Sequence, residues 1–220
     1  MSDKLRLHFE KTGRAVYISH LDLMHTMQRA FSRAEYELKY SEGFNPHPQI
    51  SIALPLSVGV GSVGEIMDFR LKGDADLREL PARLSAVMPE GLRVTDCYEQ
   101  VNKIALLKYL EIRGEFEYDD RPLQEMTEEL NRFFSRDAIV IEKKTKRGQG
   151  QSDIRPAIRE IRFTEGENAV QLHAVISAQE PTLNPALLAD ALRQLQPELA
   201  PDFARFDRIE NYLENMEIFR

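Results

Sequence analysis

The sequence has 220 residues, of which 42% are hydrophobic and 30% are charged, and its formal net charge is −7. No apolar run approaches the roughly 20 residues that cross a bilayer, and the start MSDKLRLHFE is unlike a signal peptide, so we expect a cytoplasmic protein with no membrane partner. The net charge argues against a protein that coats nucleic acid indiscriminately, but it leaves room for a local basic groove.

The first half predicts strand, helix, strand, strand, helix and strand in that order. Leu5, Leu7 and Phe9 alternate with polar residues as in a half-buried strand. Ser19 and Asp22 fit a capping box, and apolar residues then follow at helical spacing as far as residue 34. The later elements are strands at 50–56 and 65–71 around a glycine-rich loop, a helix within 74–89, and a strand at 92–100.

The second half repeats this pattern without a residue-level repeat. It predicts strands at 109–116, 138–144, 158–164, 169–177 and 203–212, helices at 123–134 and 185–195, and a polar loop at 145–153. We therefore expect an α+β protein built from two ferredoxin-like (βαββαβ) units in tandem, with antiparallel sheets. The expected domains are residues 1–104 and 105–220.

Three kinds of site are disfavoured by the residues themselves. The motif GVGSVG matches the dinucleotide fingerprint, but the segment after it alternates like a strand, where the fingerprint needs a helix. His20 and His25 lie about 140° apart on a helix, so they cannot share a metal ion on one face, and we expect neither a metal nor a cofactor. The single cysteine, Cys97, lies in a predicted strand and is interpreted as a small buried hydrophobe.

The segment YSEGFNPHPQ at 40–49 gathers aromatic and polar side chains just before a strand. Tyr40 and Phe44 could stack on bases, Asn45 could pair with a base edge, and His47 could meet a phosphate, as in proteins that hold single-stranded RNA. The alternative is an ordinary turn in which Gly43 has a positive φ and Phe44 is buried in the core. These residues alone leave both interpretations open.

A second local signal is KKTKRGQGQSDIRPAIR, which is basic although the second half as a whole is acidic. A loop that holds RNA phosphates and a solvated hairpin tip both explain such a run. The candidate RNA-binding residues here are Lys143, Lys144, Lys146, Arg147 and Arg155. Arg159, at the end of this segment, and Arg162, just after it, add to the local basic excess.

Together these motifs resemble a bacterial family, the radical-SAM-linked proteins. The resemblance rests on SHLDLM at 19–24, YSEGFNPHP at 40–48, SIALPLSVG at 51–59, TKRG at 145–148 and DIRP at 153–156. Members of that family are encoded beside or fused to a radical SAM protein, often near ribonuclease and ribosomal-protein genes. The resemblance thus implies a separately encoded radical SAM partner and an RNA context, such as tRNA or rRNA. This sequence has no CxxxCxxC motif.

Three hypotheses follow. The first is a non-catalytic accessory protein that binds RNA and presents it to the radical SAM enzyme. The second is a metal-independent RNA-processing or RNA-modifying enzyme, with His20 or His47 as the acid–base group and Lys146 or Arg155 as the electrostatic element. The third is a protein–protein adaptor that docks through the acidic second half. The paired ferredoxin-like pattern is also similar in outline to CRISPR repeat-processing endoribonucleases and to some pseudouridine synthases, although fold alone does not fix function.

Overall fold

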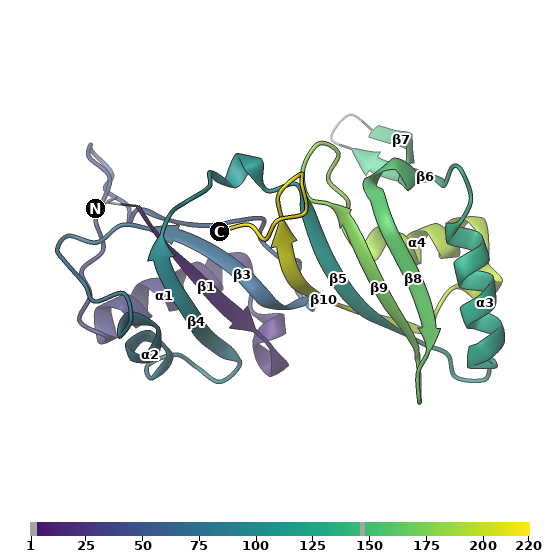
Figure 1. Cartoon of the computed structure of the whole chain (residues 1–220), viewed down its shortest axis with the longest axis horizontal. Helices are drawn as coiled ribbons and strands as arrows, with labels where there is room; N and C mark the ends of the chain where they lie inside the picture. Colours follow the sequence, from purple (N-terminus) through teal and green to yellow (C-terminus); the bar gives the residue numbers. More distant parts are fainter. Residues whose placement is uncertain (1–3, 146–147) are drawn as a thin grey trace. The chain divides into compact units, whose positions relative to one another are not determined.

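The computed structural model describes residues 4–145 and 148–220. The protein belongs to the mixed α+β class, with mostly antiparallel sheet and few helices, as expected from the sequence. It divides into two compact units (Figure 1). Unit 1 comprises Met1–Leu106 with Phe219–Arg220, and unit 2 comprises Leu107–Ile218.

Unit 1 contains an antiparallel sheet with strand order β4-β1-β3, and β2 pairs with β3. Because Phe69 of β3 pairs with both Leu5 of β1 and Ile50 of β2, these two strands flank β3. The elements in chain order are β1 (Leu5–Lys11), α1 (His20–Arg33), β2 (Ile50–Ile52), β3 (Gly61–Phe69), α2 (Leu80–Ser85) and β4 (Leu92–Glu99).

The core of unit 1 forms where the sheet meets the apolar face of α1. Leu7 and Phe9 of β1 are fully buried, and the ring of Phe31 on α1 lies 5.0 Å from that of Phe69. Helix α1 begins after Ser19 because the Ser19 Oγ accepts a hydrogen bond from the backbone amide of Asp22 at 3.2 Å. In contrast to a full capping box, the Asp22 carboxylate accepts from the Ser19 hydroxyl at 2.7 Å.

Three predicted boundaries in unit 1 were wrong. The strand expected at 50–56 ends at Ile52, since Leu54 has φ +48° and the next residue, Pro55, has no amide to donate to a ladder. Strand β3 begins at Gly61, so part of the expected glycine-rich loop is strand. Helix α2 covers only Leu80–Ser85, with Pro81 in its first turn.

Four strands of unit 2 pair antiparallel in the order β10-β5-β9-β8. Strands β6 and β7 form a separate two-stranded ribbon, so part of the loop expected at 145–153 is strand. The elements are β5 (Tyr109–Glu117), α3 (Leu123–Phe134), β6 (Val140–Thr145), β7 (Gly148–Asp153), β8 (Ile158–Glu165), β9 (Val170–Ser177), α4 (Ala186–Leu195) and β10 (Phe203–Tyr212).

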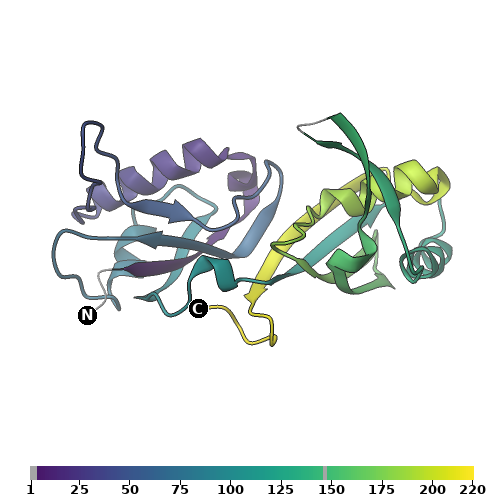
Figure 2. The same cartoon turned by 90° about the horizontal axis from the view of Figure 1, so that it is seen from above.

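The two faces of the sheet in unit 2 have opposite character. Along β5, Ile112 and Phe116 are buried, whereas Arg113, between them, is exposed. The buried face packs against helices, with the ring of Phe134 on α3 stacked 5.3 Å from that of Phe163 on β8, and Figure 2 shows α4 running along the sheet. The opposite face carries polar and charged side chains.

Cys97 lies on β4 and is only 6% exposed, in agreement with its interpretation as a buried hydrophobe. Burial, with a smaller contribution from the charge of Asp96, raises the pKa of the Cys97 thiol to about 12. The thiol therefore stays protonated at neutral pH and is a poor nucleophile.

Candidate nucleic-acid interface

Residues 40–48 form a narrow projection of unit 1, called the tongue here. The backbone amide of Ser41 donates to the carbonyl of His47 at 2.8 Å, and Tyr40 and Pro48 form a β-bridge. At its base, the amide of Lys39 donates to the carbonyl of Arg70 at 2.9 Å, next to the end of β3. The tongue is thus a hydrogen-bonded element anchored to the sheet.

The tip of the tongue displays Phe44. Gly43 has φ +124°, a backbone conformation that a residue with a Cβ rarely adopts, and it turns the chain there. The Phe44 side chain has a relative exposure of 111%, and Tyr40 is 47% exposed. Gly43 therefore has the positive φ that the alternative interpretation expected, but Phe44 is not buried in the core. The aromatic ring faces solvent.

His47 is exposed, and its ring and its backbone amide make hydrogen bonds within the tongue. Its Nδ1 lies 2.9 Å from the Ser41 Oγ, and its backbone amide donates to the same oxygen at 3.1 Å. Its Nδ1 also lies 3.4 Å from the carbonyl oxygen of Asn45, a residue exposed at the tip. These bonds favour a role for His47 in holding the turn that presents Phe44 and Asn45.

His20 is the first residue of α1, and its Nδ1 is buried with no hydrogen-bond partner among the described residues. Within 4–145 and 148–220, no hydrogen bond joins His20 to His47. Over those same ranges, no three His, Cys, Asp or Glu side chains gather closely enough to hold a metal ion.

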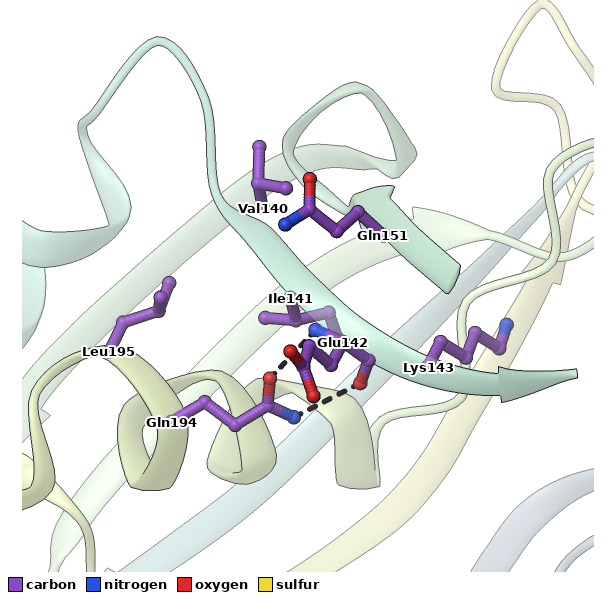
Figure 3. Close-up of a pocket in the computed structure, with 7 residues that line it drawn as sticks. All are labelled: Val140, Ile141, Glu142, Lys143, Gln151, Gln194 and Leu195. Atoms are coloured by element: carbon purple, nitrogen blue, oxygen red, sulfur yellow. Dashed lines mark hydrogen bonds between the residues drawn. The ribbon is translucent and has the colours of Figure 1, made fainter. Parts of the chain in front are cut away.

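In unit 2, Lys143 and Lys144 lie on β6, opposite Gly150 and Gln149 of β7. A hollow of about 590 Å³ lies beside this ribbon, and Gln194 of α4 holds the ribbon there (Figure 3). The Gln194 side chain accepts from the amide of Glu142 at 2.7 Å and donates to its carbonyl at 3.2 Å. Lys143 lines this hollow, whereas Lys146 and Arg147 lie outside the described residues.

Arg155 is half-buried, and its guanidinium braces the backbone. Its Nε donates to the carbonyl of Arg136 at 3.2 Å, and its Nη1 donates to the carbonyl of Ile158 at 2.8 Å. Two donors of this candidate RNA-binding residue are therefore already used at the start of β8.

A second hollow of about 540 Å³ lies beside β8. It is lined by residues at the end of α3, in the turn before β8, and on β8 and β9: Asn131, Phe134, Ser135, Arg155, Arg159, Glu160, Ile161, Arg162 and His173. Of these, His173 was missed by the sequence reasoning. The alternation of the strand could have indicated it, because His173 lies between Leu172 and Ala174, which are buried, and so points to the opposite face of the sheet.

His173 belongs to a chain of hydrogen bonds on the polar face of unit 2. Its Nε2 lies 3.0 Å from Oε1 of Glu111, and the hydroxyl of Tyr212 donates to Oε2 of Glu111 at 2.7 Å. Burial alone would raise the pKa of Glu111, but the hydrogen bonds from Tyr212 and His173 and the charges of His173 and Arg113 lower it. Burial and the bond to Glu111 raise the pKa of Tyr212 to about 12.

We expect Glu111→Gln to lower the free energy of unfolding at pH 7 by about 1.5–3 kcal/mol, because a hydrogen bond to a charged group contributes on this scale. Since the pKa of Glu111 is lower in the folded protein, its stabilisation is complete above the usual carboxyl value of 4.5 and is lost as the pH falls below it. Urea unfolding of both proteins at pH 7 and pH 3 measures this. A difference that stays constant with pH would show that Glu111 acts through packing alone.

Along the described stretches of chain, no helix has the length and apolar character that a membrane crossing requires.

The protein is thus of the mixed α+β class, with an exposed aromatic tongue on unit 1 and, on unit 2, a hollow beside β8 lined by Arg155, Arg159 and Arg162. The chain belongs to the bacterial family described as "Uncharacterized protein conserved in bacteria (DUF2344)", which matches residues 4–185. That description names no radical SAM protein. A comparison with curated proteins gives no match.

Among solved structures, the chain is similar to one in "Crystal Structure of a Cbf5-Nop10-Gar1 Complex", with a TM-score of 0.51 and 11% identity. The likeness covers 94% of this chain and 48% of that one, so this chain spans about half its length, and at this identity it shows the fold alone. "Crystal Structure of an Unknown Protein from Galdieria sulphuraria" matches with a TM-score of 0.26 and 10% identity, over 94% of this chain and 98% of that one. A TM-score this low supports no conclusion.

Proposed function

We propose that this protein is an accessory protein that binds single-stranded RNA through the tongue and presents it to a separate enzyme. The observation that carries the proposal is the full exposure of Phe44 on a hydrogen-bonded projection. An exposed Phe side chain forgoes about 1.5–3 kcal/mol of burial free energy. A base stacked on the ring would recover much of that free energy, and any of the four bases has a face that can stack.

The polar groups around Phe44 suit an unpaired base. Asn45 is exposed beside it and could donate to and accept from a base edge, and Tyr40 offers a second, partly exposed ring. Duplex RNA hides these base edges and faces, so the tongue should prefer single strands. The basic residues of unit 2, beginning with Lys143, would add sequence-independent attraction to phosphates.

The identity of the partners rests on the sequence resemblance. We propose a separately encoded radical SAM protein as the enzyme and tRNA or rRNA as the source of the single strand. We also interpret each unit as ferredoxin-like. The strand orders β4-β1-β3-β2 and β10-β5-β9-β8 are equivalent, and in each unit the helices follow the first and the third of these four strands, as in the βαββαβ pattern, which supports this interpretation.

Fluorescence anisotropy with a labelled RNA of about 12 nucleotides, a length within the range that single-strand-binding folds cover, tests the proposal. We expect the single strand to bind at least about tenfold more tightly than its duplex, with an affinity that falls as salt rises. Equal affinities for strand and duplex, or no binding at low salt, would contradict it.

Incubation of the purified protein with the same RNA in EDTA separates the accessory role from RNA cleavage, one form of the enzymatic alternative. An accessory protein leaves the RNA intact. Discrete cuts that disappear in His47→Ala would support a metal-independent RNA-processing enzyme instead.

A further inference from the structure

The polar face of the sheet in unit 2 carries a row of basic side chains across three strands. Arg162 of β8 lies directly opposite His173 of β9, and His173 lies directly opposite Arg113 of β5. Directly opposite residues have Cβ atoms about 4.5–5.5 Å apart, so the two arginines flank one imidazole. The Glu111 carboxylate, 3.0 Å from His173 Nε2, and Asp207, directly opposite Arg113, offset part of this positive charge on the β5 side. The positive charge that remains for a further anion therefore lies toward Arg162 on the β8 side.

The hollow of about 540 Å³ opens at the β8 end of this row. Its charged lining consists of Arg155, Arg159, Arg162 and Glu160, which gives a net formal charge of +2 (three positive, one negative) with His173 neutral. The volume lies within the range of small-molecule sites and accommodates a nucleotide as well as a bare ion. The hollow is therefore large enough and has the correct sign for a phosphate group.

The arginines in this hollow differ in how many of their guanidinium donors already make hydrogen bonds within the protein. Arg155 donates to two backbone carbonyls and shapes the wall. The guanidinium of Arg159 stands 5.0 Å from the Tyr109 ring centre, with Nη1 at 3.5 Å from the Tyr109 hydroxyl, which leaves its other donors available. Arg162 is exposed and makes no ion pair or hydrogen bond with any residue in the described parts of the chain.

His173 is held in one orientation by its contact with Glu111. Because Nε2 meets the Glu111 carboxylate at 3.0 Å, Nδ1 is the ring nitrogen left to meet a ligand, and it donates to a phosphate oxygen only when the ring is the doubly protonated imidazolium. A tetrahedral phosphate presents several oxygens in different directions, whereas a carboxylate presents two in one plane. Donors that come from two strands match the first shape better than the second.

We propose that the hollow beside β8 binds a phosphate group of the RNA backbone, held by Arg159 and Arg162 with His173 beside them. The assignment to RNA rests on the function proposed above, while the phosphate site does not. The tongue would then hold the bases of single-stranded RNA, and this hollow would hold a phosphate of an RNA backbone. Arg159, Arg162 and His173 become binding residues, and Glu111 positions His173.

Arg162→Ala in the full-length protein tests this, with Arg193→Ala as the matched control because Arg193 is an exposed arginine of α4 outside the hollow. For the labelled single-stranded RNA, we expect Arg162→Ala to weaken binding about tenfold and to reduce the slope of log affinity against log salt by about 0.7. Arg193→Ala should change neither quantity. Arg162→Lys should restore the salt slope but only part of the affinity, because lysine keeps the charge and loses the planar fork.

The second arm of the test is a titration with inorganic phosphate. It is followed by the NMR chemical shifts of the His173 ring protons. Saturable shifts in the wild type that vanish in Arg162→Ala support the phosphate site. If those shifts vanish while RNA affinity is unchanged, the site takes free phosphate and its assignment to RNA is overturned. If Arg162→Ala matches Arg193→Ala in both arms, the site is overturned, and a surviving effect of Phe44→Ala on RNA would show that the tongue still binds.

Discussion

Replacement of Phe44 by alanine should weaken the binding of single-stranded RNA about 5- to 150-fold, because one base stacked on an aromatic ring contributes about 1–3 kcal/mol. Stability should not change, since the fully exposed ring buries nothing in the fold. Anisotropy titration gives the first quantity, and thermal unfolding gives the second. A large loss of affinity with no loss of stability would show that the Phe44 side chain serves a ligand and not the fold.

Two further variants of unit 1 serve as controls for this result. Phe44→Trp keeps a stacking surface and should retain the affinity. Tyr17→Ala removes another aromatic side chain of unit 1, which is 70% exposed but lies in the segment Gly13–Tyr17, and should have no effect. Equal losses for Phe44→Ala and Tyr17→Ala would indicate a general effect of surface aromatics and would contradict the role of the tongue.

The second large effect concerns the buried ion pair of unit 1. We expect Asp68→Ala to destabilise the protein by about 3–5 kcal/mol, because it leaves the charge of Arg6 buried without a partner. Arg6 is completely buried, and its Nε and Nη2 donate to the two Asp68 oxygens at 2.6 and 3.0 Å. Gln100 donates to the same carboxylate at 2.7 Å, and the Arg6 guanidinium stands 4.7 Å from the ring centre of Phe219.

Urea unfolding measures this loss, and Glu37→Ala is the matched control. Glu37 pairs with Lys72, but both side chains are mostly exposed, and pairs of this kind contribute about 0–1 kcal/mol. If Asp68→Ala cost no more than Glu37→Ala, water or another group would have to stabilise the Arg6 charge. The ion pair would then contribute little to the fold.

Much of the fold could be predicted because its signals are local. Ser19 and the apolar spacing that follows it predict α1 to within a residue, and the strand expected at 203–212 is β10. Failures occurred where a local signal was overruled by backbone geometry or by pairing. Strand β2 ends early, at Ile52, because Leu54 has a positive φ, and the glycine-rich β7 is strand because it pairs with β6.

The candidate site could be predicted only in part. Composition identified Phe44, Asn45 and His47 as a group, but it could not show whether the ring points into the core or into solvent. His173 and Glu111 are 62 residues apart, so their contact depends on the register of β5 against β9. Arg155 was predicted to bind RNA from its charge, whereas its backbone hydrogen bonds arise from the turn that precedes β8.

Ultraviolet crosslinking of the wild-type protein to a labelled single-stranded RNA, with mass spectrometry of the crosslinked peptides, tests the central claim most directly. The proposal predicts nucleotide adducts on Phe44 or Tyr40 at the tongue, and their loss when excess unlabelled single strand competes. Adducts confined to other segments, with the tongue peptide recovered unmodified at saturating RNA, would contradict it.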